Sequence, residues 1–221
     1  MIPTKPGDPV SFETYRGQHA LKRRFGLRLN AIQPNESIKA LLFSPAGQGK
    51  TSFVRVLAYE MFNRKLIKYY FETVAGKFET KNDLDAFIRR IPANSIIFID
   101  EIHGLPGGVR DALYPAIQDN IYMFNYDVNY RKLPAGLHWI GATTDLGKVH
   151  AALRRRLLPI PLEPLSLEDK KWIALLQPRA VDENAAELMA ERSWSPWEIK
   201  DELYATAGDI ATEKGSWHIR L

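Results

Sequence analysis

The sequence predicts an α/β fold in which a mostly parallel sheet is sandwiched between helices and is followed by a small all-α domain. Three observations support this prediction. Over residues 1–164, short apolar segments alternate with segments of helical periodicity, a pattern typical of a parallel sheet covered on both faces. A glycine-rich turn joins the first apolar segment to a helix. After residue 164 the strand pattern stops and only helical segments follow.

The predicted elements follow one another in a regular order. A proline-rich arm over residues 1–10 precedes a helix over residues 12–31, which ends at a Gln-Pro-Asn turn. Apolar, β-branched runs predict strands at 38–43, 66–74, 95–99, 137–142 and 159–162. Helical spacing predicts helices at 50–61, 81–90, 109–119 and 149–156. An aromatic, strand-like segment covers residues 121–131.

The remainder of the chain is expected to form a second domain. Helical patterns occur at residues 166–176, 182–191 and 196–211, with no strand pattern between them. The expected domains are therefore an α/β domain over residues 1–164 and a helical domain over residues 165–221.

Composition narrows the class of protein. The 221 residues are 45% hydrophobic and 25% charged, which is enough for a sizeable globular core. The chain has no cysteine, which excludes disulfides and zinc–thiolate sites. The net charge of +4 permits a polyanionic partner without requiring one. Neither a signal peptide nor an apolar run of roughly 18–20 residues is recognisable, so we expect a cytoplasmic protein without a membrane partner.

The turn in LLFSPAGQGKTSF, residues 41–53, is typical of a phosphate-binding loop because it follows a strand and opens a helix. Small residues let the backbone N–H groups face phosphate at the positive end of a helix dipole. Lys50 would reach the β- and γ-phosphates, and the Thr51 hydroxyl would hold Mg²⁺. Ser44 replaces the usual leading glycine, which is acceptable if the backbone there does not need a positive φ. The residues expected to bind ATP here are Pro45, Ala46, Gly47, Gln48, Gly49, Lys50, Thr51 and Ser52.

Two further motifs supply candidate catalytic groups. Asp100 and Glu101 end a buried apolar strand, where ligands sit in open α/β sheets. We assign Asp100 to Mg²⁺ and Glu101 to polarising the attacking water. Thr144 ends the next central strand and is our candidate for bridging the γ-phosphate and the water, with Thr143 second. The arginine run at residues 154–156 could stabilise transition-state charge or could form a solvated, anion-binding face.

Four motifs together resemble the AAA+ ATPases, a class of P-loop NTPases, and within them the RuvB family of Holliday-junction motors. They are YRGQ at residues 15–18, FIDEIH at 98–103, LYPAIQD at 113–119 and IGATT at 140–144. The resemblance covers residues 12–215. It implies a helical lid, a hexameric ring, and ATP bound between subunits with an arginine finger from the neighbour. Residue by residue, it implies adenine contacts from Tyr15 and Arg16, and a finger at Arg156 with Arg154 as runner-up.

The sequence also departs from the family's pattern. The lid motif G-T-P-R corresponds to residues 194–197, so Trp197 stands where an arginine would contact the γ-phosphate. Lys200, about one helical turn further on, is a candidate substitute, and lid packing is the alternative role of Trp197. The family's DNA-contacting winged-helix domain would begin where the given sequence ends, at Leu221. The segment 120–137 corresponds to a hairpin that is a possible contact for a protein partner.

Three functions remain open on the sequence alone. The first is an ATP-driven motor that moves or remodels duplex or branched DNA in recombination or replication. The second is an ATP-switched assembly factor, like a clamp or helicase loader, acting through a protein partner. The third is a degenerate structural subunit, against which Lys50, Thr51, Asp100 and Glu101 argue because all four are present.

Overall fold

The core of the protein is a five-stranded parallel sheet with strand order β2-β3-β6-β1-β7. The structure is a computed structural model that describes residues 2–3, 8–33, 36–175, 183–193 and 195–199. The sheet strands are β1 (Lys39–Phe43), β2 (Tyr69–Val74), β3 (Ser95–Asp100), β6 (Leu137–Thr143) and β7 (Leu158–Pro161). These five strands confirm the predicted parallel α/β fold.

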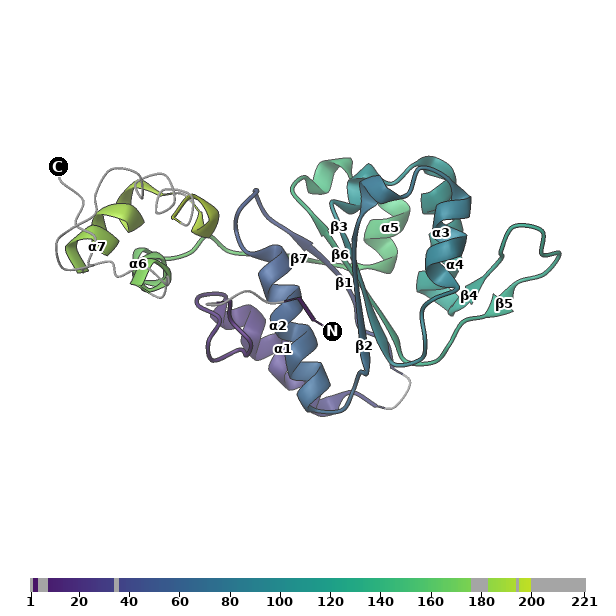
Figure 1. Ribbon diagram of the computed structural model, residues 1–221, viewed down its shortest axis with the longest axis horizontal. Coiled ribbons are helices and arrows are strands. Elements are labelled where there is room, and N and C mark those ends of the chain that lie inside the picture. The colour runs from purple at the N-terminus through teal and green to yellow at the C-terminus, as the bar shows by residue number, and fades with distance from the viewer. Residues whose placement is uncertain (1, 4–7, 34–35, 176–182, 194, 200–221) are drawn as a thin grey trace.

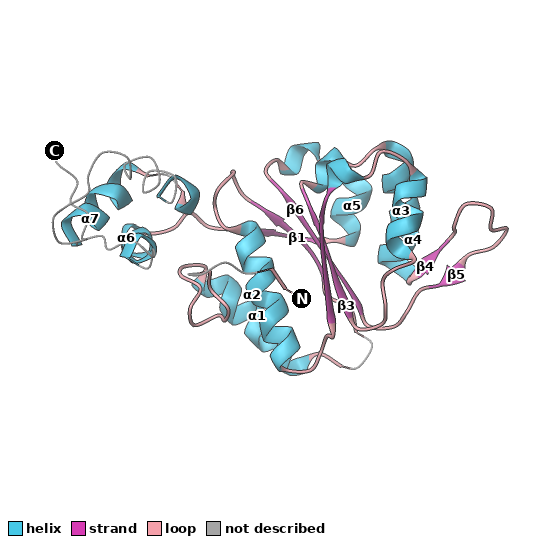
Figure 2. Ribbon diagram, in the orientation of Figure 1, coloured by secondary structure: helices cyan, strands magenta, loops and turns pink. Residues whose placement is uncertain are grey.

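Helices cover both faces of the sheet (Figure 2). In the first domain they are α1 (His19–Ala31), α2 (Lys50–Asn63), α3 (Lys81–Ile88), α4 (Gly107–Asp119) and α5 (Ala151–Arg156). Short 3-10 helices occur at Ala75–Lys77, Ile102–Gly104 and Leu146–Lys148. Figure 1 shows α1 and α2 on one face and α3, α4 and α5 on the other.

The alternation of side chains along each strand divides the core into two layers. Leu42, Phe98 and Ile140 belong to the apolar cluster that contains α1 and α2. Their neighbours along the strands, Leu41 and Ile97 among them, belong to the cluster that contains α3, α4 and α5. Strands β3 and β6 are buried almost throughout, which explains why they read as continuous apolar runs in the sequence.

The helix predicted over residues 12–31 begins later than expected, at His19. Gly17 and Gln18 both have positive φ, 70° and 52°, which interrupts a right-handed helix. The Gln18 side-chain amide instead makes two hydrogen bonds to the backbone of Glu163. It donates to the carbonyl at 2.6 Å and accepts from the N–H at 3.0 Å. Gln18 therefore holds the residues that follow β7 against the start of α1, a contact between distant parts of the chain.

The N-terminal residues 8–18 are fixed to the core through Phe53 of α2. Phe53 is fully buried, and its ring contacts Phe12, Tyr15 and Phe25 with centroid separations of 6.0, 5.5 and 5.5 Å. Burying one aromatic side chain of this size contributes about 2–3 kcal/mol. This cluster brings Tyr15 to the start of α2, where the glycine-rich loop ends.

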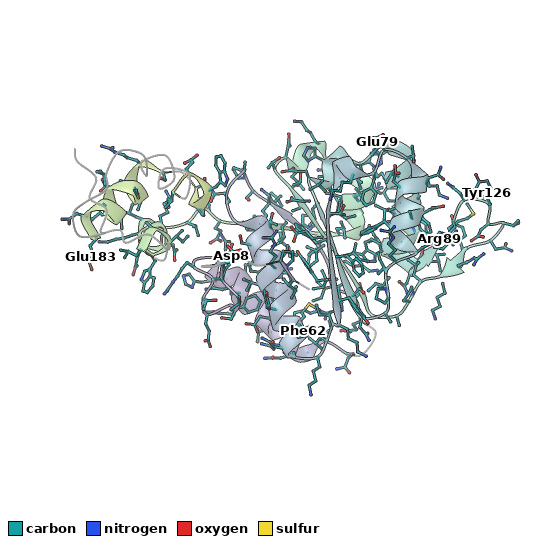
Figure 3. The ribbon with its side chains drawn as sticks, viewed as in Figure 1. Asp8, Phe62, Glu79, Arg89, Tyr126 and Glu183 are labelled. Carbon is teal, nitrogen blue, oxygen red and sulfur yellow. The ribbon has the colours of Figure 1, made fainter. Side chains whose placement is uncertain are left out.

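The aromatic, strand-like segment at residues 121–131 forms a hairpin, as the resemblance implied for residues 120–137. Its two short strands, β4 (Ile121–Tyr122) and β5 (Arg131–Lys132), pair antiparallel beside the main sheet. Tyr122 is buried and donates to the buried carboxylate of Asp85 on α3 at 2.7 Å. The tip of the hairpin is exposed to solvent, and Tyr126 points away from the body of the protein (Figure 3).

The C-terminal part of the described chain is helical, as predicted. It contains α6 (Leu167–Leu175), α7 (Glu183–Arg192) and a helical turn at residues 196–199. Ala174, Ala186, Met189 and Ile199 form its small apolar core. The rest of the helix predicted at residues 196–211 lies outside the described residues, and the boundary at residue 164 stays a prediction. In the described part of the chain, no helix is both long and apolar enough to span a membrane.

Buried His138 makes the stability of the fold dependent on pH. Its Nδ1 atom accepts from the Ile38 N–H at 3.0 Å, and burial lowers its pKa from 6.5 to about 4. Because the unfolded chain binds this proton more tightly, the stabilisation is complete above about pH 6.5 and is lost as the pH falls through 4. A shift of this size corresponds to about 3 kcal/mol at most.

We therefore expect chemical denaturation to show a smaller loss of unfolding free energy between pH 6.5 and 4.5 in His138→Asn than in the wild type. The asparagine oxygen can still accept from Ile38 but does not titrate. His19→Asn, at an exposed position, is the matched control and should retain the wild-type slope. Equal slopes in wild type and His138→Asn would contradict the assignment.

Candidate functional site

A cavity of about 330 Å³ lies at the carboxyl edge of the sheet, beside the amino terminus of α2. Its walls come from the glycine-rich loop, the ends of β3 and β6, and the C-terminal helical region. The lining residues are Ala46, Gly47, Gln48, Gly49, Lys50, Thr51, Ser52, Asp100, Glu101, Thr144, Pro196 and Trp197. Three motifs that are separate in the sequence therefore meet at one cavity.

The conformation of the loop depends on two glycines. Gly47 and Gly49 have φ values of 76° and 87°, which side chains rarely allow. A Cβ atom on Gly49 would lie 2.8 Å from the Tyr15 hydroxyl, which itself donates to the Gly49 carbonyl at 3.2 Å. Ser44 does not have a positive φ, and its N–H continues the β1–β6 ladder to Thr143 at 3.4 Å. The serine in place of the usual glycine is therefore compatible with this backbone.

Lys50 is a buried cation at the bottom of the loop. Its Nζ donates to the carbonyls of Ser44 and Pro45 at 2.8 and 3.0 Å, and only 7% of the residue is exposed. Burial lowers the pKa of Lys50, while Glu101 and Asp100 act in the opposite direction. The loop thus combines a desolvated ammonium group with the positive end of the α2 dipole, an arrangement that favours a bound anion.

Thr51 and Asp100 form an oxygen pair at the edge of the cavity. The Thr51 hydroxyl donates to Asp100 Oδ2 at 2.9 Å. Hydroxyl and carboxylate oxygens are ligands that Mg²⁺ accepts, and Mg²⁺ usually keeps several waters and substrate phosphates as its other ligands. Among the described residues, no three histidine or acidic side chains are arranged so that they could hold a metal ion together, so this pair suits Mg²⁺ better than a metal that needs a full protein cage.

Glu101 is held in an uncommon backbone conformation, with φ 48°. Its Oε2 atom accepts from the Thr144 N–H at 3.1 Å and from the Thr144 hydroxyl at 3.0 Å. A non-glycine residue in this region is a recognised feature of functional sites. Glu101 and Thr144 are thus joined directly at the cavity, although 42 residues separate them in the chain.

Sequence reasoning did not assign a role to His103, which lies 3.2 Å from Glu101 Oε2 through its Nδ1 atom. The same Nδ1 is 2.9 Å from the hydroxyl of Thr143. Thr143 donates its only proton to the Asp145 carbonyl at 3.0 Å, so the proton on this contact belongs to His103. The signal available in the sequence was the position of His103 in FIDEIH, two residues after Glu101.

Thr143 and Thr144 are neighbours in the sequence but have different environments in the structure. Thr143 is fully buried and holds the turn after β6 through His103 and Asp145. Thr144 lines the cavity. The position that we preferred from the sequence is therefore the one with access to a ligand.

Five of the expected site residues do not line the described cavity, namely Tyr15, Arg16, Pro45, Arg154 and Arg156. Tyr15 packs behind the loop, and the Arg16 guanidinium stacks on Trp172 of α6 at 3.8 Å. Arg154 and Arg156 end α5, and Arg156 donates to the Ala152 carbonyl at 3.1 Å. Lys200 lies outside the described residues.

The C-terminal helices approach the loop directly. A Cβ atom on Gly47 would lie 2.6 Å from Ser195 Oγ and 3.2 Å from Trp197 Cβ. Trp197 is 62% exposed although it lines the cavity. An aromatic surface therefore occupies the position where the sequence pattern led us to look for a cation.

Comparison with known proteins supports a common origin for this arrangement. Residues 8–160 match the family described as Holliday junction DNA helicase RuvB P-loop domain. The RuvB subunit of the Holliday junction branch migration complex from Kosmotoga olearia is 31% identical, over 96% of this chain and 64% of that protein. The subunit from Campylobacter lari is 33% identical, over 92% of this chain and 62% of that protein. The chain thus spans somewhat less than two thirds of these relatives.

The solved structures agree with this result. The Thermotoga maritima RuvB Holliday junction branch migration motor superimposes with a TM-score of 0.74 at 25% identity, covering 95% of this chain and 70% of that one. The strand order, the loop at the cavity and the family match over most of the chain lead to one conclusion. This chain belongs to the RuvB family of P-loop ATPases.

Proposed function

We propose that this chain is the ATPase and lid portion of a RuvB-type motor that hydrolyses ATP to move or remodel duplex or branched DNA. The observation that carries the proposal is the meeting of Lys50, the Thr51–Asp100 pair and the Glu101–Thr144 pair at one cavity. Anion binding, metal binding and water activation are the three requirements of phosphoryl transfer to water. The family match adds that related proteins carry out branch migration at Holliday junctions.

In this proposal, each group of the cavity has a separate role. Residues 46–52 bind the phosphates through backbone N–H groups, whereas Pro45, which has no N–H to donate, shapes the start of the loop. Lys50 transfers its hydrogen bonds from the loop carbonyls to the β- and γ-phosphates. Thr51 and Asp100 hold Mg²⁺, which neutralises charge that develops on the phosphate oxygens. Glu101 accepts a proton from the attacking water, and Thr144 orients that water against the γ-phosphate. Tyr15 and Arg16 belong to the adenine side of the site.

A ring of subunits, six by analogy with the family, completes the site. Arg156 and Arg154 end a helix away from the cavity of their own chain, which supports an arginine that reaches the γ-phosphate from a neighbouring copy. We propose Arg156 as this finger and residues 1–164 and 165–221 as ATPase domain and lid. The exposed tip of the β4–β5 hairpin, with Tyr126 and Val128, is the proposed contact for a protein partner.

One observation favours a second candidate function. Trp197, rather than a cation, lines the lid side of the cavity in the described residues. An aromatic side chain cannot sense the γ-phosphate by charge, which weakens the coupling between hydrolysis and lid movement. An ATP-switched loader, in which ATP binding drives assembly and slow hydrolysis resets it, tolerates this weak coupling better than a motor does.

Steady-state ATP turnover measured against protein concentration, with and without duplex and four-way-junction DNA, distinguishes the two functions. A motor ring predicts turnover per subunit that rises with concentration and is stimulated by DNA, with a steep loss of stimulation at high salt. Lys50→Ala is the control for contaminating activity and should bind no nucleotide. Slow turnover that is indifferent to DNA would favour the loader, and no turnover in the wild type would remove both.

Glu101→Gln should separate ATP binding from hydrolysis. Glutamine keeps an oxygen that accepts from Thr144 but is not a base, so we expect unchanged ATP affinity and a loss of kcat of roughly 10²–10⁴-fold. Binding is measured by fluorescent-nucleotide titration and turnover by phosphate release. Turnover within a few-fold of the wild type would show that Glu101 is not the base.

Arg156→Ala should abolish most turnover, by about 10³-fold or more, while ATP affinity remains. Mixing this variant with Lys50→Ala should restore part of the activity, because some interfaces then combine an intact loop with an intact finger. Arg155→Ala, at an exposed position of the same helix, is the matched control and should stay near wild-type turnover. Failure of the mixture would place Arg156 outside a shared site, and a larger loss in Arg154→Ala would transfer the role to Arg154.

A further inference from the structure

Arg156 packs on an aromatic side chain, and the proposed mechanism gives this contact no role. We call Arg156, Tyr114 and His150 together the aromatic clamp. The Arg156 guanidinium lies over the ring of Tyr114 of α4, 4.7 Å from its centroid. Tyr114 in turn stacks on His150, with ring centroids 6.3 Å apart and an interplanar angle of 25°. The three residues therefore form a continuous series of contacts, from His150 through Tyr114 to Arg156.

Hydrogen bonds fix Tyr114 and His150 within this clamp. The Tyr114 hydroxyl is 2.9 Å from His150 Nδ1. The same nitrogen accepts from the Ala152 N–H at 3.3 Å, which caps the start of α5. An Nδ1 atom that accepts from a backbone N–H carries no proton of its own, so the Tyr114 hydroxyl is the donor. His150 thus ties Tyr114 to the same short helix that ends in Arg156.

The arginine itself has few other restraints. Its Nη1 atom donates to the Ala152 carbonyl at 3.1 Å, and its Nε atom is buried without a hydrogen-bond partner among the described residues. A free arginine side chain has many rotamers, and holding it in one of them costs entropy. The face of Tyr114 and the Ala152 carbonyl together limit that freedom while leaving donors of the guanidinium for an external anion.

We propose that Tyr114 is a positioning residue that orients Arg156 toward the γ-phosphate bound by a neighbouring subunit, with His150 fixing the Tyr114 ring. This inference rests on the proposed function, because it assigns to Arg156 the finger role. The chemistry of the clamp matches that role: a cation–π contact holds a guanidinium without consuming its hydrogen bonds. A carboxylate in the place of Tyr114 would instead compete with the phosphate for the same donors.

Tyr114→Leu should therefore reduce kcat by about tenfold, the loss that corresponds to a cation–π contact of about 1–2 kcal/mol. KM for ATP should stay within about twofold, because the neighbour's arginine acts mainly in the transition state. Tyr114→Phe keeps the ring face beneath Arg156 and should recover most of the lost kcat. Tyr69→Leu, at a half-exposed tyrosine on the edge strand β2, is the matched control and should behave as the wild type.

Two further measurements show whether Tyr114 acts through Arg156. The double variant Tyr114→Leu/Arg156→Ala should lose no more turnover than Arg156→Ala alone, since both changes remove one function. Mixing Tyr114→Leu with Lys50→Ala should raise turnover above the level of either protein, whereas mixing it with Arg156→Ala should not. Thermal unfolding of each variant shows whether a loss of turnover comes from misfolding. If Tyr114→Leu is misfolded, the turnover of Tyr114→Phe is compared with that of the wild type instead.

The outcomes separate the clamp from the function on which it rests. If the wild type hydrolyses ATP and the kcat of Tyr114→Leu is within twofold of the wild-type value, the proposed role of the clamp is overturned and the proposed function is not. Additive losses in the double variant, or no rescue by Lys50→Ala, would also overturn it by placing Tyr114 outside the finger's action. Absence of wild-type turnover would remove the proposed function and the clamp together.

Discussion

The parallel register of β1, β3 and β6 is the constraint on which the site depends. Phe43 at the end of β1 lies opposite Thr143 at the end of β6, and Ile99 of β3 lies opposite Gly141 of β6. The glycine-rich loop, the Asp100–Glu101 pair and the Thr143–Thr144 pair therefore leave the sheet at the same level. Parallel strands end at the same edge, so three distant motifs converge without a long loop to connect them.

The packing of the two faces protects this register. A shift of one residue in any central strand would move Leu42, Phe98 or Ile140 from the α1–α2 cluster into the opposite one, which is filled by different side chains. Phe53 then fixes residues 8–18 to α2, and Tyr15 closes against Gly49. The cavity is thus supported from behind by the hydrophobic core and from the side by the N-terminal segment.

The site divides into a part that one chain supplies and a part that it does not. The glycine-rich loop, the Thr51–Asp100 pair and the Glu101–Thr144 pair all lie at one cavity, whereas the arginines of α5 lie elsewhere, and Arg156 packs on Tyr114. In the proposed mechanism, this division makes turnover depend on assembly, because the arginine that neutralises transition-state charge comes from a second copy. The close approach of Ser195 to Gly47 places the C-terminal helical region beside the loop.

The sequence by itself determined the parallel α/β fold, the phosphate loop and the acidic pair, because strand periodicity, glycine at positions of positive φ and strand-end acids are local signals. It did not determine that α1 begins only at His19, that Tyr122 of the expected hairpin donates to Asp85, or that His103 joins Glu101. Each of these depends on contacts between distant residues, such as Gln18 with Glu163 and Asp85 with Tyr122. The sequence preferred Thr144 over Thr143, and the tertiary structure supplies the physical reason, since Thr143 is buried in the turn whereas Thr144 lines the cavity.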